Sequence, residues 1–184
     1  MKKLLLITGD LATGKSTFAR LLSLRYGIPM FFKDSIKEVL GDVIGFSNRE
    51  ENKQLSNASM NLMFHIFTEF ARFEKALILE SNFHTEELEK LHSIANEQGY
   101  EVLTLVLRGN VDILHQRYLN RIHHENRHPV HLSTTLDVYE DFKRYTEKSR
   151  QEEIPGEFLL INADDFSYQL NEADLTRIDE FIRR

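Results

Sequence analysis

The chain has 184 residues, of which 41% are hydrophobic and 28% are charged, and a chain of this length can bury one hydrophobic core. It contains no cysteine, which excludes a disulfide scaffold and any metal site with thiolate ligands. The formal net charge of −6 argues against a protein that coats long nucleic acids, because such proteins carry a basic surface. We therefore expect one domain over residues 1–184 without a long nucleic acid as its partner.

No stretch of the sequence approaches the ~20 apolar residues of a membrane-spanning helix, so we expect no membrane partner. The apolar start of the chain resembles a signal peptide, but it ends at Thr8-Gly9-Asp10, before the apolar core of such a peptide would be complete. We expect a cytoplasmic protein, which the lack of cysteine also fits.

Five apolar runs of strand length predict a sheet, and none clearly alternates polar with apolar residues, which is typical of strands buried on both faces. These runs are Lys3–Thr8, Ile28–Phe32, Ala76–Glu80, Val102–Leu107 and Glu157–Ile161. Helical patterns cover Ser16–Tyr26, Ile36–Leu40, Glu50–Glu74, Thr85–Gln98, Val111–His124, Thr135–Arg150 and Ala173–Arg184. The alternation of strands and helices predicts an α/β fold with right-handed crossovers.

A complete phosphate-loop motif follows the first expected strand. The residues Gly9-Asp10-Leu11-Ala12-Thr13-Gly14-Lys15-Ser16 fit G-x-x-x-x-G-K-S/T, and a helix is expected to begin at their end. In such a loop the backbone N–H groups and the helix N-terminus point at phosphate oxygens. We expect these residues and Thr17 to bind ATP, with Lys15 neutralising the β- and γ-phosphates and Ser16 ligating Mg²⁺.

The second expected strand is followed by Lys33-Asp34-Ser35-Ile36-Lys37. A carboxylate at this strand end can take the proton of an incoming hydroxyl, so Asp34 is a candidate general base. The flanking lysines would keep Asp34 ionised and hold an acidic acceptor or the γ-phosphate. The alternative is that Asp34 or Ser35 only caps the next helix.

The third expected strand ends at Glu80, whose carboxylate is a candidate partner for Mg²⁺ through a water molecule. The alternative is an ordinary surface carboxylate at a strand end. Ser81 and Asn82 follow directly, and we expect them to line the carboxyl edge of the sheet, where α/β folds bind ligands.

Arginines and histidines concentrate after the fourth expected strand. Arg117 and Arg121 lie four residues apart and therefore share a helix face, and Arg127 follows them. We expect a lid over approximately residues 115–134 whose arginines stabilise charge on a transferring phosphoryl group, with Arg127 on the nucleotide. The alternative is a solvated basic face. The histidines lack the spacing of a zinc-binding helix, and we expect them to contact phosphate or solvent.

Together these segments resemble the predicted small P-loop kinases related to polynucleotide kinase, chloramphenicol phosphotransferase and the zeta-toxin kinases. The resemblance rests on Gly9–Ser16, residues 33–37, Leu79-Glu80-Ser81-Asn82-Phe83 and Arg117–Pro129. It implies a P-loop NTPase fold of three α/β/α layers, with a five-stranded parallel sheet of order 2-3-1-4-5 and a helical lid.

The resemblance also implies roles for single residues. Asp34 matches the general base of the relatives, Lys37 matches a basic residue that bridges acceptor and phosphate, and Arg117 and Arg121 match lid arginines. Lys37 stands where Arg is more usual, and Glu80 stands where Asp is common. The loop of residues 162–165 is expected near the adenine.

The function expected from the sequence is transfer of the γ-phosphate of ATP, with Mg²⁺, to a hydroxyl of a small-molecule acceptor. The expected catalytic residues are Lys15, Asp34, Lys37, Arg117 and Arg121. One alternative is a kinase for the 5′-hydroxyl of nucleosides or oligonucleotides. Another is a regulatory switch that binds ATP without transfer, against which Asp34 speaks because a switch needs no acceptor base.

Overall fold

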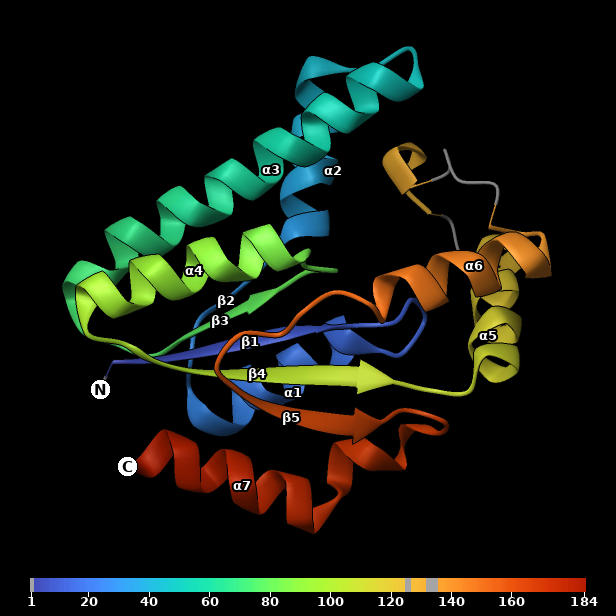
Figure 1. The fold of residues 1–184 in the computed structure, drawn as a ribbon. Helices are drawn as coiled ribbons and strands as arrows, with labels where there is room; N and C mark the ends of the chain where they lie inside the picture. Colours follow the sequence, from blue (N-terminus) through green and yellow to red (C-terminus); the bar gives the residue numbers. More distant parts are fainter. Residues whose placement is uncertain (1, 125–126, 132–135) are drawn as a thin grey trace.

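A computed structural model describes residues 2–124, 127–131 and 136–184 of the chain, and it has the three layers that the sequence predicts (Figure 1). The strands are β1 (Lys3–Gly9), β2 (Met30–Phe32), β3 (Leu77–Glu80), β4 (Glu101–Arg108) and β5 (Glu157–Asn162). The α-helices are α1 (Lys15–Tyr26), α2 (Lys33–Ile44), α3 (Arg49–Phe70), α4 (Thr85–Gln98), α5 (Val111–His124), α6 (Tyr139–Ser149) and α7 (Glu172–Arg183). Short 3-10 helices cover Ala71–Phe73, Pro129–His131 and Phe166–Leu170.

The five strands form one parallel sheet of order β2-β3-β1-β4-β5, which confirms the predicted topology. Near the carboxyl end of β1, Ile7 pairs with Glu80 of β3 on one side and with Leu105 of β4 on the other. This register brings the loop after β1 and the end of β3 to the same edge of the sheet, where ligands of parallel α/β folds bind.

Helices α3 and α4 cover one face of the sheet, and α1 and α7 cover the other (Figure 1). Along β1, Leu4 and Leu6 belong to the core under α3 and α4, whereas Leu5 and Ile7 belong to the core against α1 and α7. All four side chains are fully buried. A central strand with two covered faces needs apolar residues at successive positions, as the uninterrupted apolar run predicts.

Several predicted elements are wrong in detail. Helix α2 begins at Lys33 with Phe32 as its N-cap, so neither Asp34 nor Ser35 caps it. Helix α6 begins at Tyr139, later than the sequence predicts. Strand β5 lies at the edge of the sheet, and none of its residues belongs to the core under α3 and α4. The face of β5 on that side is therefore open to solvent, and Phe158 is 49% exposed.

Helices α5 and α6 form a hairpin beyond the carboxyl ends of the strands (Figure 1). Leu114 and Tyr118 of α5 pack against Phe142 of α6 in a small hydrophobic cluster of their own. The lid predicted over residues 115–134 includes most of α5 and the 3-10 helix Pro129–His131, while residues 125–126 and 132–134 lie outside the described part of the chain.

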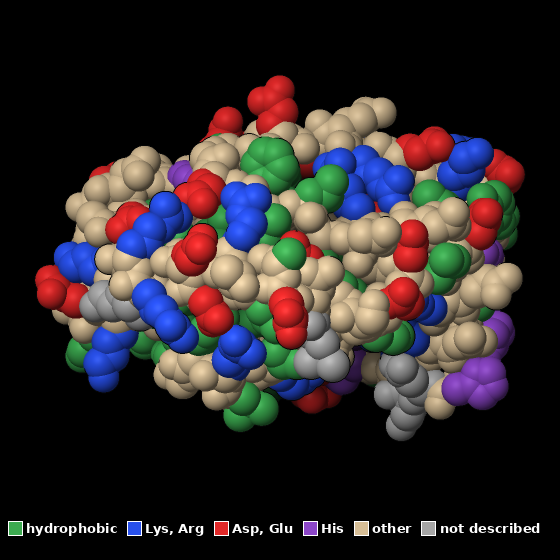
Figure 2. All heavy atoms as spheres, turned by 90° about the horizontal axis from the view of Figure 1, so that it is seen from below, with side chains coloured by type: hydrophobic (Ala, Val, Ile, Leu, Met, Phe, Trp, Pro, Cys, Tyr) green, Lys and Arg blue, Asp and Glu red, His purple; other side chains and the backbone are tan. Residues whose placement is uncertain are grey.

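Figure 2 shows the face of the molecule seen from below Figure 1, where acidic and basic side chains are interspersed. Within the described ranges, no helix has both the length and the apolar character needed to cross a membrane.

Candidate active site

The loop Gly9–Ser16 curls between β1 and α1 and depends on its two glycines. Gly9 has φ +123°, and a Cβ on it would lie 2.0 Å from the carbonyl oxygen of Leu107 in β4. Gly14, at φ +85°, is the N-cap of α1. Only glycine adopts such φ angles without strain, and at Gly9 only glycine also fits against the backbone of β4. Both positions therefore require glycine for the loop to form.

The side chain of Lys15 folds back into this loop. Its ammonium donates to the carbonyl oxygens of Gly9, at 3.1 Å, and Asp10, at 2.6 Å, and the residue is only 8% exposed. Burial lowers the pKa of Lys15, while the negative charges of Glu80 and Asp34 oppose that shift. A buried cation at the start of a helix is the arrangement that attracts phosphate.

The Ser16 hydroxyl, one residue on, donates to Glu80 Oε2 at 2.9 Å. Burial raises the pKa of Glu80, and Lys15 and the Ser16 hydroxyl pull it in the opposite direction. A hydroxyl and a carboxylate are hard oxygen ligands that fit Mg²⁺ when nucleotide phosphates complete its shell. The described residues contain no cluster of three or more His, Asp or Glu side chains that could hold a metal ion by themselves.

Two adjoining clefts open at this edge of the sheet, which we name the loop cleft, of about 500 Å³, and the side cleft, of about 570 Å³. Both are lined by Ser16, Arg20, Asp34, Arg121 and Arg127. The loop cleft adds Leu11–Lys15, Thr17, Glu80, Asn82, Arg117, Asn120 and Phe166. The side cleft adds Phe32, Ser35, Glu38, His128, Pro129 and His131.

Asp34 lies at the border of the two clefts, in the first turn of α2. Burial is the main cause of the raised pKa of Glu80 and Tyr145 and of the lowered pKa of Lys15. The negative charge of Asp34 adds to the first two shifts and opposes the third. The structure therefore places the predicted base, the loop lysine and the predicted metal-side acid around one cavity.

The two lysines that flank Asp34 point to other elements. The Lys33 ammonium lies 4.0 Å from Glu87 Oε1 of α4. Lys37 donates to the carbonyl oxygen of Val130 at 3.3 Å, and Asn52 of α3 donates to the same oxygen at 3.0 Å. Lys37 thus holds the 3-10 helix Pro129–His131 here, and its predicted bridging role stays a prediction.

The predicted arginines divide between the two ends of the loop cleft. Arg117 donates to the carbonyl oxygens of Ala163, at 2.7 Å, and Asp164, at 2.5 Å. Its guanidinium carbon lies 4.3 Å from the centre of the Phe166 ring. It therefore lies at the loop after β5, on which the resemblance places the adenine. Arg121 and Arg127 instead line both clefts, beside Asp34.

Two histidines of the predicted lid, His128 and His131, contact carboxylates of α2. His128 Nε2 lies 2.9 Å from Asp42 Oδ1, and His131 Nε2 lies 2.8 Å from Glu38 Oε1. These pairs attach the segment Arg127–His131 to the helix that carries Asp34, which the sequence pattern did not predict.

Two further residues of the site escaped the sequence analysis. Arg20 lines both clefts, and it lies four residues after Ser16, so helix periodicity could have found it. Tyr145 of α6 has a pKa raised by burial and by the charge of Asp34, which lies at the border of the two clefts. Its place depends on how α6 packs on α5, which no local pattern reveals.

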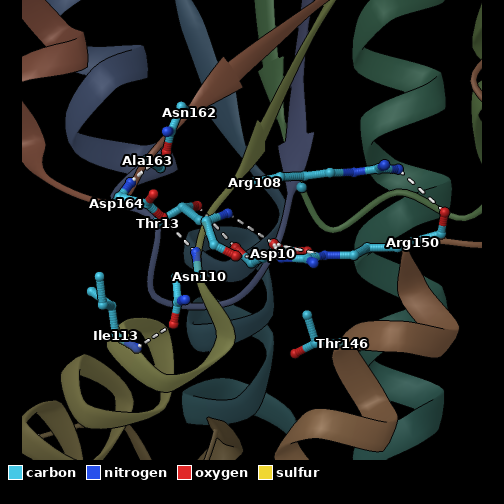
Figure 3. Close-up of polar contacts among 12 residues, drawn as sticks. Asp10, Thr13, Arg108, Asn110, Ile113, Thr146, Arg150, Asn162, Ala163 and Asp164 are labelled. Carbon is cyan, nitrogen blue, oxygen red and sulfur yellow. Dashed lines mark hydrogen bonds and ion pairs between the residues drawn. The ribbon is translucent and has the colours of Figure 1, made fainter.

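The polar groups of Asp10 are all directed at the protein. Its N–H donates to the carbonyl oxygen of Leu107 at 2.8 Å. Its carboxylate accepts from the N–H of Gly109 at 3.2 Å and from Arg150 Nη2 at 2.6 Å (Figure 3). Its predicted contact with a nucleotide stays a prediction.

Comparison with protein-family models gives no match for this chain, and comparison with curated proteins gives none either. Solved structures do match. A proposed kinase from Chloroflexus aurantiacus superimposes with a TM-score of 0.79 at 23% identity, over 98% of this chain and 96% of that one. A gluconokinase from Sinorhizobium meliloti gives 0.62 at 12% identity, over 99% and 96% of the two chains. A shikimate kinase from Bacteroides thetaiotaomicron gives 0.60 at 20% identity, over 99% of each. What the chain shares with these proteins, over almost its whole length, is the fold.

Proposed function

We propose that the protein is a kinase that transfers the γ-phosphate of ATP, with Mg²⁺, to a hydroxyl of a small-molecule acceptor. The observation that carries this proposal is the position of Asp34, which lines the same cleft as Lys15, Ser16 and Glu80. A phosphate loop alone suits any nucleotide-binding protein. A carboxylate beside it, at the entrance to a second cleft, suits the deprotonation of an acceptor.

The loop cleft supplies the groups that a triphosphate needs. The N–H groups of the loop and the ammonium of Lys15 bind the β- and γ-phosphates, while Arg117 and Phe166 lie toward the base end. Ser16 and Glu80 are the residues that would hold Mg²⁺, which neutralises phosphate charge when bound. Arg121 and Arg127, at the border of the clefts, stabilise the charge that develops on the phosphoryl group.

The side cleft is the proposed acceptor site. Its volume of about 570 Å³ fits a small molecule, and Asp34 stands between it and the loop cleft. As the acceptor oxygen bonds to the γ-phosphorus, its proton passes to the Asp34 carboxylate and the bond between the γ-phosphorus and the bridging oxygen breaks, releasing ADP. Two of the structures with this fold carry the names of small acceptors, gluconate and shikimate, which supports an acceptor of this size.

The test is incubation with γ-labelled ATP, Mg²⁺ and a panel of sugars, sugar acids, nucleosides, antibiotics and short oligonucleotides, followed by mass spectrometry of whatever gains phosphate. The proposal expects one small-molecule class to be labelled. Labelling of the 5′-hydroxyl of nucleosides or oligonucleotides would instead establish the first alternative. Tight ATP binding without any labelled acceptor would establish the regulatory switch.

The Asp34→Asn variant connects the test to the site. It should retain ATP binding and lose transfer by roughly 10²–10⁴-fold, because the acceptor loses its base. Glu89→Gln, on the exposed side of α4, removes a negative charge away from both clefts and should transfer at the wild-type rate. Unchanged transfer by Asp34→Asn would remove this residue from the mechanism.

A further inference from the structure

Asp10 is the one acidic residue in the phosphate loop, where it stands next to Gly9. A carboxylate at this position repels the triphosphate that the proposed function places in the loop. Its side chain is 1% exposed, so water does not screen it. The negative charge must therefore be neutralised inside the protein.

Arg150 supplies the compensating charge. Its Nη2 donates to Asp10 Oδ2 at 2.6 Å, and its Nε lies 3.2 and 3.3 Å from the two carboxylate oxygens (Figure 3). The N–H of Gly109 adds a further hydrogen bond to Oδ2 at 3.2 Å. A guanidinium that engages a carboxylate with two nitrogens forms one of the stronger and more directional pairs in proteins.

The same arginine joins the two ends of the α5–α6 hairpin. Residues Arg108–Asn110 lead into α5, and Arg150 ends α6. Arg150 donates to the carbonyl oxygen of Gly109, and its own carbonyl oxygen accepts from Arg108 Nη2 at 3.3 Å (Figure 3). The hairpin that carries Arg117 and Arg121 therefore closes on Asp10 at its base.

We propose that Arg150 is a positioning residue of the nucleotide site: by pairing with Asp10 it cancels the negative charge inside the phosphate loop and fixes the α5–α6 hairpin beside that loop. This inference rests on the proposed function, because it assumes that the loop binds a triphosphate. Arg150 acts through Asp10 and touches no reacting atom.

A charge-compensation cycle tests this role with Mg·ATP and adenosine as probes in calorimetry. Arg150→Met leaves the Asp10 carboxylate buried and unpaired, and it should weaken Mg·ATP binding about tenfold or more. Adenosine carries no phosphate, so its affinity should change less than twofold. The double variant Asp10→Asn/Arg150→Met holds no unpaired charge and should recover the affinity for Mg·ATP to within about threefold.

The hairpin is followed by hydrogen exchange in the same variants. Amides of α5 should exchange faster in Arg150→Met and also in the double variant, because both lack the guanidinium that closes the base of the hairpin. Arg144→Met, which makes the same change on an exposed part of α6, should alter neither exchange nor affinity. If Arg150→Met does not fold, affinity and exchange can still be measured on two other proteins, the double variant and the single variant Asp10→Asn.

The outcomes separate this inference from the proposed function. Wild-type affinity for Mg·ATP in Arg150→Met, an equal loss for adenosine, or a double variant as weak as Arg150→Met would each overturn the role of Arg150 and leave the kinase proposal standing. If the amides of α5 exchange at the wild-type rate in both variants, Arg150 does not fix the hairpin, and that part of the proposal is wrong. A wild-type protein that binds no Mg·ATP would overturn both proposals.

Discussion

Gly9 occupies the point where the first strand turns into the phosphate loop against the backbone of β4. At φ +123°, a Cβ would lie 2.0 Å from the Leu107 carbonyl oxygen, and that backbone cannot move without breaking the β1–β4 pairing. Gly9→Ala should therefore lower the free energy of unfolding by about 3 kcal/mol or more, because strain at this angle and the contact add together.

Urea denaturation measures this change, and Gly27→Ala is the matched control. Gly27 ends α1 at φ +64° with no atom within 4 Å of a built Cβ, so its substitution should cost only about 1–2 kcal/mol for the left-handed backbone. Equal losses in the two variants would show that the contact with Leu107 does not constrain the loop.

At the level of single residues, the sequence predicts the phosphate loop well because the motif carries its own context of strand, loop and helix. Residues whose neighbours are distant in the chain are different. Lys37 bonds to a carbonyl 93 positions away, and Asp10 pairs with an arginine 140 positions away. Neither contact leaves a pattern in the neighbouring sequence. The sequence could therefore identify these residues but could not identify their partners.

Lys37 and Asn52 offer a test of what holds the segment Arg127–His131 against α2. Both donate to the carbonyl oxygen of Val130, a residue that is 1% exposed. If Lys37 only positions this segment, Lys37→Met and Asn52→Ala should raise the KM for the acceptor by similar factors, with kcat little changed. A kcat lowered in Lys37→Met alone would instead support the bridging role that the resemblance implies.

Among the secondary structure elements, the N-terminus of α4 shows a carboxylate that acts as a distant cap. Glu152 accepts from the N–H of Thr85 at 2.8 Å and from its hydroxyl at 2.7 Å, and it lies 2.8 Å from His84 Nδ1. The hydroxyl bond of Thr85 is the main cause that lowers the pKa of Glu152 to about 2, and the contact with His84 adds to it. Ionised Glu152 therefore attaches the segment after α6 to α4.

The pH dependence of stability follows from this lowered pKa. The folded state holds Glu152 ionised more strongly than the unfolded state, so its stabilisation is complete above the unfolded pKa and is lost as pH falls toward about 2. Glu152→Gln should lower the free energy of unfolding by about 1–2 kcal/mol at pH 7. In urea titrations this difference should shrink between pH 5 and pH 3. Glu153→Gln is the control, since its carboxylate lies outside this contact, and a pH-independent difference for Glu152→Gln would contradict the assignment.

The boundaries of the elements follow the same division between local and distant causes. Helices α4 and α5 have the predicted bounds, because α4 is stopped by Gly99 and α5 follows Gly109-Asn110 directly. Helix α2 starts three residues earlier than predicted, since its N-cap, Phe32, has no capping side chain. The open face of β5 was missed because burial depends on which helices cover a strand, and the strand sequence does not contain that information.

At the scale of the whole molecule, the proposed site predicts that the free energy of unfolding rises with the concentration of Mg·ATP. The ligand binds a loop that joins the central strand to α1, so only the folded protein can hold it. At a Mg·ATP concentration 100 times the Kd, binding should add about 2.7 kcal/mol to the free energy of unfolding. For a chain of this size that raises the Tm by roughly 5–10 °C.

Lys15→Met should remove most of this thermal shift, because the loop loses the buried ammonium that we propose binds the phosphates. Lys53→Met, an equal loss of charge at an exposed position of α3, should shift like the wild type. Replacing Mg²⁺ with EDTA should reduce the shift for the wild type and for Lys53→Met, since Ser16 and Glu80 would then have no ion to hold beside the phosphates. A shift of the same size in Lys15→Met would mean that ATP binds elsewhere on the molecule, and the assignment of both clefts would then be wrong.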